Sequence, residues 1–238
     1  MPSLAQSFLA QPPSGPGIVL LDLDGTLTDP YPGISASIEV ALQAQALPLP
    51  GPAELAAWIG PPMQRSFADY CQALGRGDPA QLLRDYRVRF DQLGWRENRV
   101  YTGIPEAMAQ LHGSGRRLLL ATAKPHVFAN RIVAHFGLAQ WLDKVYGSEL
   151  DGNRTDKTEL LQHLLEHENL DPGACLMVGD REHDMRAARH HGIKAVGVLW
   201  GYGGEAELLA AGAQALVDQP GHLVQVVEGL LATCDSDG

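Results

Sequence analysis

The chain contains few cysteines, few basic residues and no long apolar run, and each of these shortages excludes a class of protein. Its three cysteines among 238 residues are Cys71, Cys175 and Cys234, which form no CxxC pair. An odd number of widely spaced cysteines does not make a disulfide framework, so we expect reduced thiols and a cytoplasmic location. Since no stretch approaches roughly 18 continuous apolar residues, a membrane-spanning helix is not expected.

The chain also has fewer positively than negatively charged residues. Lys and Arg together number 18 against 28 Asp and Glu, which gives a formal net charge of −10. A surface that binds nucleic acid needs clustered Lys and Arg to meet the backbone phosphates, so nucleic acid is not an expected partner. A small anionic substrate is not excluded, but its site would need local positive charge.

What the sequence does contain is a set of short apolar runs that each end at a polar residue or a turn. They cover residues 18–22, 117–122, 174–180 and 193–200. Continuous runs without alternation are typical of strands buried on both faces of a parallel sheet. Helical patterns accompany the later runs, over residues 124–136, 155–168 and 181–191. This alternation predicts a doubly wound α/β domain.

The interval between the first two apolar runs does not follow this alternation. It holds several helix-like stretches separated by Pro and Gly turns. We therefore expect residues 30–99 to be a helical insert after the first strand, and residues 17–29 and 100–234 to form the α/β core. Residues 1–16, which end in QPPSGP, are expected to be a flexible lead-in.

Acidic residues gather where predicted strands end. Asp22 and Asp24 close the first run, and Asp180 and Asp184 lie in "GDREHD". Binding sites in α/β sheets form beyond the carboxyl ends of the strands, so these acids should converge. Two carboxylates so close raise each other's pKa unless a cation lies between them, which indicates a metal, a shared proton or both. Oxygen ligands alone, with room for waters, favour Mg²⁺ over zinc.

Four segments of the chain carry most of its conspicuous polar residues. They read "DLDGTLTDP" from Asp22, "LLLATAKP" up to Pro125, "DGNRTDKTELL" around Lys157, and "MVGDREHD". In this order they resemble the four motifs of the haloacid dehalogenase superfamily. The pattern is similar to the branch of phosphoglycolate phosphatases and 5′-nucleotidases, whose helical cap lies between the first two motifs, so the resemblance implies that residues 30–99 are this cap and that residues 17–29 and 100–234 form the catalytic core. The resemblance implies a Rossmann-like sheet with strand order 5-4-1-2-3 and a mobile cap.

The resemblance also implies catalytic roles. Asp22 would attack phosphorus and form an aspartyl-phosphate. Asp24 would protonate the leaving oxygen and then activate the water that attacks this intermediate. Thr122 and Lys157 would bind the phosphoryl oxygens, Lys157 as a point charge. An acid at position 24 favours phosphate chemistry over dehalogenation, because halide leaves without a proton.

Further residues of the same motifs are expected to bind the metal or the substrate. Mg²⁺ would be held by Asp22, the main-chain carbonyl of Asp24, Asp180 and, directly or through water, Asp184. Gly25 allows the sharp turn that directs backbone amides toward the phosphoryl group. The expected substrate-binding residues are Gly25, Thr26, Ala123, Lys124 and Arg65.

Two of these positions, and His183 beside them, have alternative interpretations. Lys124 either reaches the substrate or starts the next helix. Arg65, in "WIGPPMQRSF", either clamps a substrate anion or is an ordinary surface arginine. His183, inside the fourth motif, either supports the site or lies on the surface.

Some motifs are better explained without a functional role. "HLLEH" matches an inverted zinc-protease pattern, but its leucines form an apolar stripe that leaves His163 and Glu166 on the solvated side of a helix. His190 and His191 end a predicted helix, where they suit the dipole. "GYGG", residues 201–204, lacks the ending of a phosphate loop and predicts a strand-to-helix turn.

These expectations describe a phosphoric monoester hydrolase that acts on small molecules. The first substrate to consider is 2-phosphoglycolate and the second is a nucleoside monophosphate. A phosphomutase, a non-catalytic protein that binds a phosphometabolite, and a phosphotyrosine phosphatase are the alternatives. The sequence does not indicate an oligomeric state.

Overall fold

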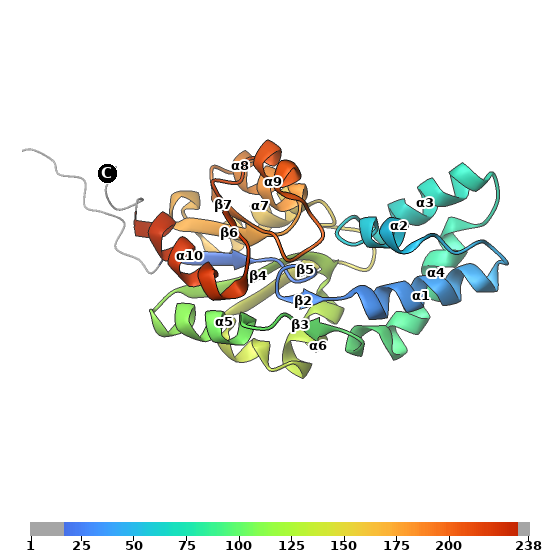
Figure 1. Ribbon diagram of the computed structural model, residues 1–238, viewed down its shortest axis with the longest axis horizontal. Coiled ribbons are helices and arrows are strands. Elements are labelled where there is room, and N and C mark those ends of the chain that lie inside the picture. The colour runs from blue at the N-terminus through green and yellow to red at the C-terminus, as the bar shows by residue number, and fades with distance from the viewer. Residues whose placement is uncertain (1–16, 233–238) are drawn as a thin grey trace, which may run out of the picture.

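The computed structural model describes residues 17–232, so the predicted lead-in at 1–16 and the last residues of the predicted core, 233 and 234, lie outside the described part. Figure 1 shows two parts side by side: a sheet covered by helices, and a group of helices that projects from one end of it. The first part corresponds to the predicted α/β core and the second to the predicted cap.

The core contains a six-stranded parallel sheet. Its strands are β1 (Ile18–Leu21), β4 (Arg117–Pro125), β5 (Lys144–Ser148), β6 (Cys175–Gly179), β7 (Lys194–Val198) and β8 (Ala215–Val217). The order across the sheet is β5-β4-β1-β6-β7-β8. Read from the other edge, this confirms the order that the family resemblance implies, with β8 added as a further strand beside β7.

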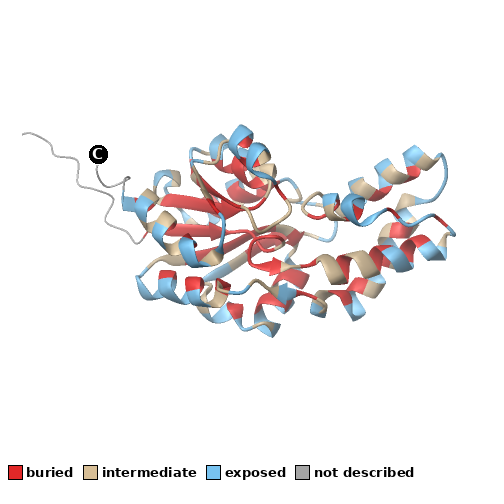
Figure 2. Ribbon diagram, viewed as in Figure 1, coloured by how far each residue is buried: buried red, intermediate tan, exposed pale blue. Residues whose placement is uncertain are grey.

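All four predicted strands are present, and β1 lies at the centre of the sheet. Its residues alternate between two apolar clusters: Val19 and Leu21 belong to one, Ile18 and Leu20 to the other. Burial of each such side chain stabilises the fold by roughly 1.5–3 kcal/mol. Figure 2 shows the strands as a buried layer between outer helices. A strand buried on both faces explains why the run is apolar without alternation.

Within residues 17–232, three helices cover each face of the sheet. On one face lie α5 (Ile104–Gly113), α6 (His126–His135) and α10 (Leu223–Ala232), and on the other α7 (Lys157–Glu168), α8 (Glu182–His190) and α9 (Glu205–Ala211). The helices predicted over residues 124–136, 155–168 and 181–191 are confirmed as α6, α7 and α8, and each begins one or two residues later than predicted. The chain also contains short 3₁₀ turns: η1 (Gly94–Arg96), η2 (Leu138–Trp141), η3 (Pro172–Ala174) and η4 (Pro220–His222).

Four further helices pack around an apolar cluster of their own. They are α1 (Tyr31–Ala44), α2 (Pro52–Ala57), α3 (Met63–Leu74) and α4 (Pro79–Gln92). Their shared cluster includes Ile38, Phe67 and Phe90, and the core contributes Phe128 to it. The chain leaves and re-enters the core through two short antiparallel strands, β2 (Thr28–Asp29) and β3 (Arg99–Val100). The predicted limits of the cap, residues 30 and 99, lie in or next to this pair of strands, and the division into domains stays a prediction.

The described cysteines agree with the expectation of reduced thiols. Cys71 and Cys175 are free and buried, while Cys234 lies outside the described residues. None of the helices between residues 17 and 232 is both long and apolar enough to cross a membrane.

Candidate active site

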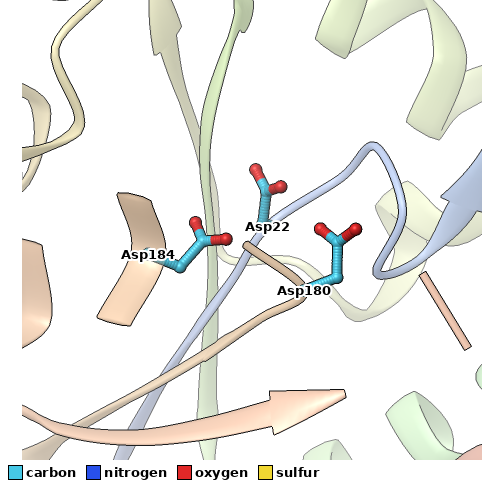
Figure 3. A group of neighbouring side chains, drawn as sticks. All are labelled: Asp22, Asp180 and Asp184. Carbon is cyan, nitrogen blue, oxygen red and sulfur yellow. The ribbon is translucent and has the colours of Figure 1, made fainter. Parts of the chain in front are cut away.

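Three of the predicted acids converge at the carboxyl ends of β1 and β6. Asp22 follows β1, Asp180 follows β6, and Asp184 lies in the first turn of α8. Figure 3 shows their carboxylates gathered around one space, and one oxygen from each lies within 4.8 Å of the others. All three are buried. Throughout the described residues, no other group of three or more acidic, His or Cys side chains has such an arrangement, and this includes the HLLEH helix.

Lys157 adds a positive charge to this acidic trio. It is the first residue of α7, whose N-cap Asp156 accepts a hydrogen bond from the backbone of Thr158 at 2.7 Å. The Nζ atom donates to Asp22 Oδ1 at 2.8 Å and lies 2.7 Å from Asp184 Oδ1. Burial alone would lower the pKa of Lys157, but the two carboxylates outweigh it and raise this pKa above its ordinary value. The lysine therefore stays charged.

The trio still carries excess negative charge. Three carboxylates and one ammonium leave a formal charge of −2. Burial, with the nearby carboxylates of Asp184 and Asp22, raises the pKa of Asp180 well above its ordinary range. A divalent cation would neutralise this charge, and Lys157 contacts only one oxygen each of Asp22 and Asp184. The donors are oxygens, which Mg²⁺ prefers, so the residues fit the expected metal.

Asp24 lies apart from the trio, with a cation of its own. Its Oδ2 is 2.5 Å from Lys124 Nζ, and the two side chains are only 13% and 5% exposed. The other oxygen, Oδ1, is buried without a hydrogen-bond partner in the described structure. Burial raises the pKa of Asp24, although the nearby ammonium opposes this rise. A raised pKa suits a group that must donate a proton.

Lys124 reaches the site because β4 is longer than predicted. The strand continues past Thr122 to Pro125 with a shift in its pairing to β5, and α6 begins only at His126. Lys124 therefore does not start the next helix, and its side chain lies against Asp24; contact with a substrate stays a prediction. The Nζ atom also lies 4.9 Å from the ring centre of Phe90 on α4, which brings the cap to the same charge.

The remaining predicted residues have different surroundings. Thr122 is buried, and its Oγ1 accepts a hydrogen bond from the Lys124 backbone at 3.3 Å. Thr26 Oγ1 lies 3.5 Å from Asp180 Oδ1, and Ala123 lines the cavity over the trio. Arg65 is exposed and pairs with Asp69 at 3.6 Å, yet it also lines this cavity.

His183 also lies beside the reaction centre, where it lines the same cavity as Arg65. Burial lowers its pKa below the ordinary value, which favours the neutral ring. His183 is thus partly buried next to the cavity, and a supporting role in the site stays a prediction.

One contact at the site is missing from the sequence interpretation. The backbone of Tyr202 donates a hydrogen bond to Asp180 Oδ2 at 2.7 Å, and its hydroxyl group contacts Asp29 beside the cap crossing. Residues 201–204 do form the predicted turn, between β7 and α9. The sequence did contain one indication of this contact: residues 201–204 follow the carboxyl end of a predicted core strand, where functional loops lie.

Two cavities meet at Asp24, Ala123 and Lys124. The reaction cavity, of about 230 Å³, contains Asp22, Lys157 and Asp184. The second cavity, of about 190 Å³, extends between the cap and the core and is called the outer chamber below. Side chains that line the outer chamber include Ile34, Trp58, Leu83, Tyr86, Phe90 and Phe128.

Gly25 is tightly constrained beside the trio. Its φ of +84° is unfavourable for other residues, and a Cβ atom there would lie 2.1 Å from Asp180 Oδ2. We expect Gly25→Ala to displace Asp180 and lower kcat by about 10²-fold, since a misplacement of about 1 Å has such an effect. Steady-state kinetics and Mg²⁺ titration calorimetry would measure this. Gly113→Ala is the matched control, because nothing lies within 4 Å of its Cβ position; equal activity of the two variants would contradict the expectation.

Comparison with known proteins defines the class. The family model described as haloacid dehalogenase-like hydrolase matches residues 19–198. The chain belongs to this family, and it is a phosphatase of the family that hydrolyses phosphomonoesters.

Individual relatives carry several names. A 5′-nucleotidase of Pseudomonas aeruginosa is 45% identical over 81% of this chain and 86% of its own length. Tyrosine-protein kinase PtkA of Mycobacterium tuberculosis is 38% identical over 82% of this chain and 66% of its own length. A plasmid-encoded phosphoglycolate phosphatase of Cupriavidus necator is 30% identical over 84% of this chain and 88% of its own length. The crystal structure of a predicted phosphatase from Clostridium acetobutylicum has a TM-score of 0.84 at 34% identity, covering 91% of this chain and 100% of that one.

Proposed function

We propose that this phosphatase depends on Mg²⁺ and hydrolyses small phosphomonoesters through a phosphorylated Asp22. The observation that carries the proposal is the buried acidic trio, which Lys157 only partly neutralises, next to the separate Asp24–Lys124 pair. The proposal assigns attack on phosphorus to Asp22 and proton transfer to Asp24. Bound to the trio, and to the main-chain carbonyl of Asp24, Mg²⁺ would reduce the repulsion between Asp22 and an anionic phosphate.

In the first step, Asp22 attacks phosphorus in line with the ester bond. The new bond joins a carboxylate oxygen to phosphorus, the ester P–O bond breaks, and Asp24 gives its proton to the leaving oxygen. Thr122, Lys124 and Lys157 stabilise the negative charge on the phosphoryl oxygens. In the second step, Asp24 takes a proton from water, which attacks phosphorus and releases phosphate from Asp22.

The outer chamber supports a nucleoside monophosphate as the substrate. Its rings, among them Tyr86, Phe90 and Phe128, offer an apolar surface in the same cavity as Asp24 and Lys124. Such a surface suits a nucleobase better than the short, charged glycolate group. The relative named 5′-nucleotidase agrees with this order of preference. The second candidate, 2-phosphoglycolate, is supported by the relative from Cupriavidus necator.

The alternatives predict different products or none. A phosphomutase would return the phosphoryl group to another carbon of an organic molecule, whereas a hydrolase releases it as inorganic phosphate. A protein that only binds phosphometabolites would not need an acid beside its nucleophile, yet Asp24 is present and buried with Lys124. A phosphotyrosine side chain would need a wide entrance, and the cap residues that line both cavities favour small molecules.

The test is phosphate release from a panel of nucleoside monophosphates, 2-phosphoglycolate and a phosphotyrosine peptide. With Mg²⁺ we expect the highest kcat/KM for a nucleoside monophosphate. EDTA should stop release and added Mg²⁺ should restore it, whereas Ca²⁺ should support it poorly because it is larger and coordinates less regularly. Full activity in EDTA, with no metal found by elemental analysis, would contradict the proposal, and so would transfer of phosphate to another carbon.

A further inference from the structure

Arg181 connects the catalytic core to the cap. It follows Asp180 in the chain, and its side chain is 15% exposed. Nη1 donates a hydrogen bond to the main-chain oxygen of Ile59 at 2.6 Å. Nε donates another to Glu207 Oε1 on α9 at 2.9 Å. The guanidinium group therefore joins segments far apart in the sequence, one on each side of the site.

On the core side, Arg181 is held firmly. Glu207 Oε1 also accepts from the backbone of Glu182 at 2.9 Å, which fixes the carboxylate against the start of α8. The backbone of Arg181 itself donates to Asp184 Oδ2 at 3.2 Å. A planar guanidinium group with its Nε bonded has little freedom, so its contacts with the core largely set the direction of its Nη1 atom.

On the cap side, the contacted segment is the short connection from α2 to α3. Ile59 is 1% exposed and belongs to the apolar cluster of the cap, so its carbonyl group cannot move independently of the cap. Gly60 has a φ of +105°, and a Cβ atom there would lie 3.2 Å from Arg181 Cγ. A side chain at position 60 would therefore press against Arg181 and strain the backbone.

This connection forms a wall of both cavities. Gly60 and Pro62 line the reaction cavity as well as the outer chamber, and Pro61 and Met63 line the chamber. Two consecutive prolines limit its conformations, so a contact at Ile59 positions the whole wall. Loss of that contact would leave the trio in place but would change the shape of the space for the leaving group.

We propose that Arg181 is a positioning residue that docks residues 59–62 on the core and thereby closes the outer chamber around the leaving group. Substrates whose leaving group fills the chamber depend on this docking, and substrates with a small leaving group depend on it less. The kinetic part of this inference rests on the proposed function, whereas docking itself can be measured without any substrate.

The experiment compares Arg181→Met with Arg186→Met. Arg186 is the matched control, because it lies on α8, the helix that follows Arg181, is 66% exposed and pairs with Glu182 at 2.7 Å. Hydrogen–deuterium exchange is measured first, on the free proteins, over peptides that cover residues 57–66 and the strand β6. We expect faster exchange at 57–66 in Arg181→Met, unchanged exchange in β6, and wild-type exchange in Arg186→Met.

Kinetics then compare AMP with acetyl phosphate. Loss of a hydrogen bond to a charged group predicts a rise in KM for AMP of about 10-fold or more in Arg181→Met, with a smaller effect on acetyl phosphate. Arg181→Lys should recover part of the loss, since an ammonium group can still reach the Ile59 carbonyl oxygen. Unchanged exchange at 57–66 would overturn the docking. An equal loss of kcat with both substrates, together with weaker Mg²⁺ binding, would also overturn it, because Arg181 would then act through the metal ligands.

Failure of the proposed function would be recognised separately. If the wild-type protein released no phosphate from any substrate, yet Arg181→Met still exchanged faster at 57–66, the docking contact would be supported and the proposed hydrolysis would be rejected.

Discussion

Asp22→Asn is expected to lower kcat by at least about 10⁴-fold while the protein remains folded, because the amide is a poor nucleophile. The folded state should not be weakened strongly, since the variant removes one of three crowded carboxylates. Phosphate release from the purified variant and thermal unfolding followed by circular dichroism would measure the two effects.

Asp218→Asn is the matched control for this prediction. Asp218 is an aspartate on the surface, 70% exposed, that pairs with His222 at 2.9 Å. It lines neither the reaction cavity nor the outer chamber. Wild-type turnover is expected in Asp218→Asn. Substantial turnover in Asp22→Asn, with its purity verified, would rule out Asp22 as the nucleophile.

Asp24→Asn is expected to separate the two chemical steps. With p-nitrophenyl phosphate the leaving group is already a stable anion, so a burst of up to one equivalent of p-nitrophenolate should appear. Turnover should then stop, because no base activates water. With an alkyl phosphate the same variant should be slow from the start, by about 10²- to 10⁴-fold, since a basic alkoxide cannot leave without a proton.

The environment of Asp24 requires a control for this experiment. Lys124 loses its anionic partner in Asp24→Asn, and the main-chain carbonyl of residue 24 is an expected metal ligand. Bound Mg²⁺ must therefore be measured beside the kinetics. Equal losses for both substrates in the first step, with Mg²⁺ still bound, would show that Asp24 is not the acid that protonates the leaving group.

Most of the core could be predicted because its central strands are buried on both faces. The runs at β1 and β6 are apolar throughout, and this reflects the two clusters that they separate. The strands β5 and β8 were missed for the opposite reason. They form the two edges of the sheet, and their sequences, KVYGS and ALV, are short and only partly buried. Such short runs carry no periodic signal.

In the candidate site, too, residues at the ends of predicted strands could be placed together, whereas a contact that depends on the exact length of a strand could not be predicted. Asp22, Asp180 and Asp184 could be placed together because parallel strands bring their carboxyl ends to one edge. That Asp24 pairs with Lys124 depends on the continuation of β4 beyond Thr122, which motif spacing does not reveal.

Contacts formed only in the folded chain were not predictable. Tyr202 reaches Asp180 across 22 residues of sequence, and Arg181 reaches Ile59 across 122. Both contacts use backbone atoms, whose positions depend on how the loops approach one another. Almost every residue type supplies the same backbone donor and acceptor. A hydrogen bond to a backbone atom therefore does not restrict which amino acid is present, and no sequence pattern predicts it.

Identification of the phosphorylated residue tests the central claim most directly. Asp24→Asn would be mixed with p-nitrophenyl phosphate and Mg²⁺, quenched in acid during the burst, digested and analysed by mass spectrometry. We expect the mass of one phosphoryl group on the peptide that contains Asp22, in an amount equal to the burst, and no such adduct in Asp22→Asn. A full burst without phosphorylated peptide, or with the phosphoryl group on another residue, would contradict the account.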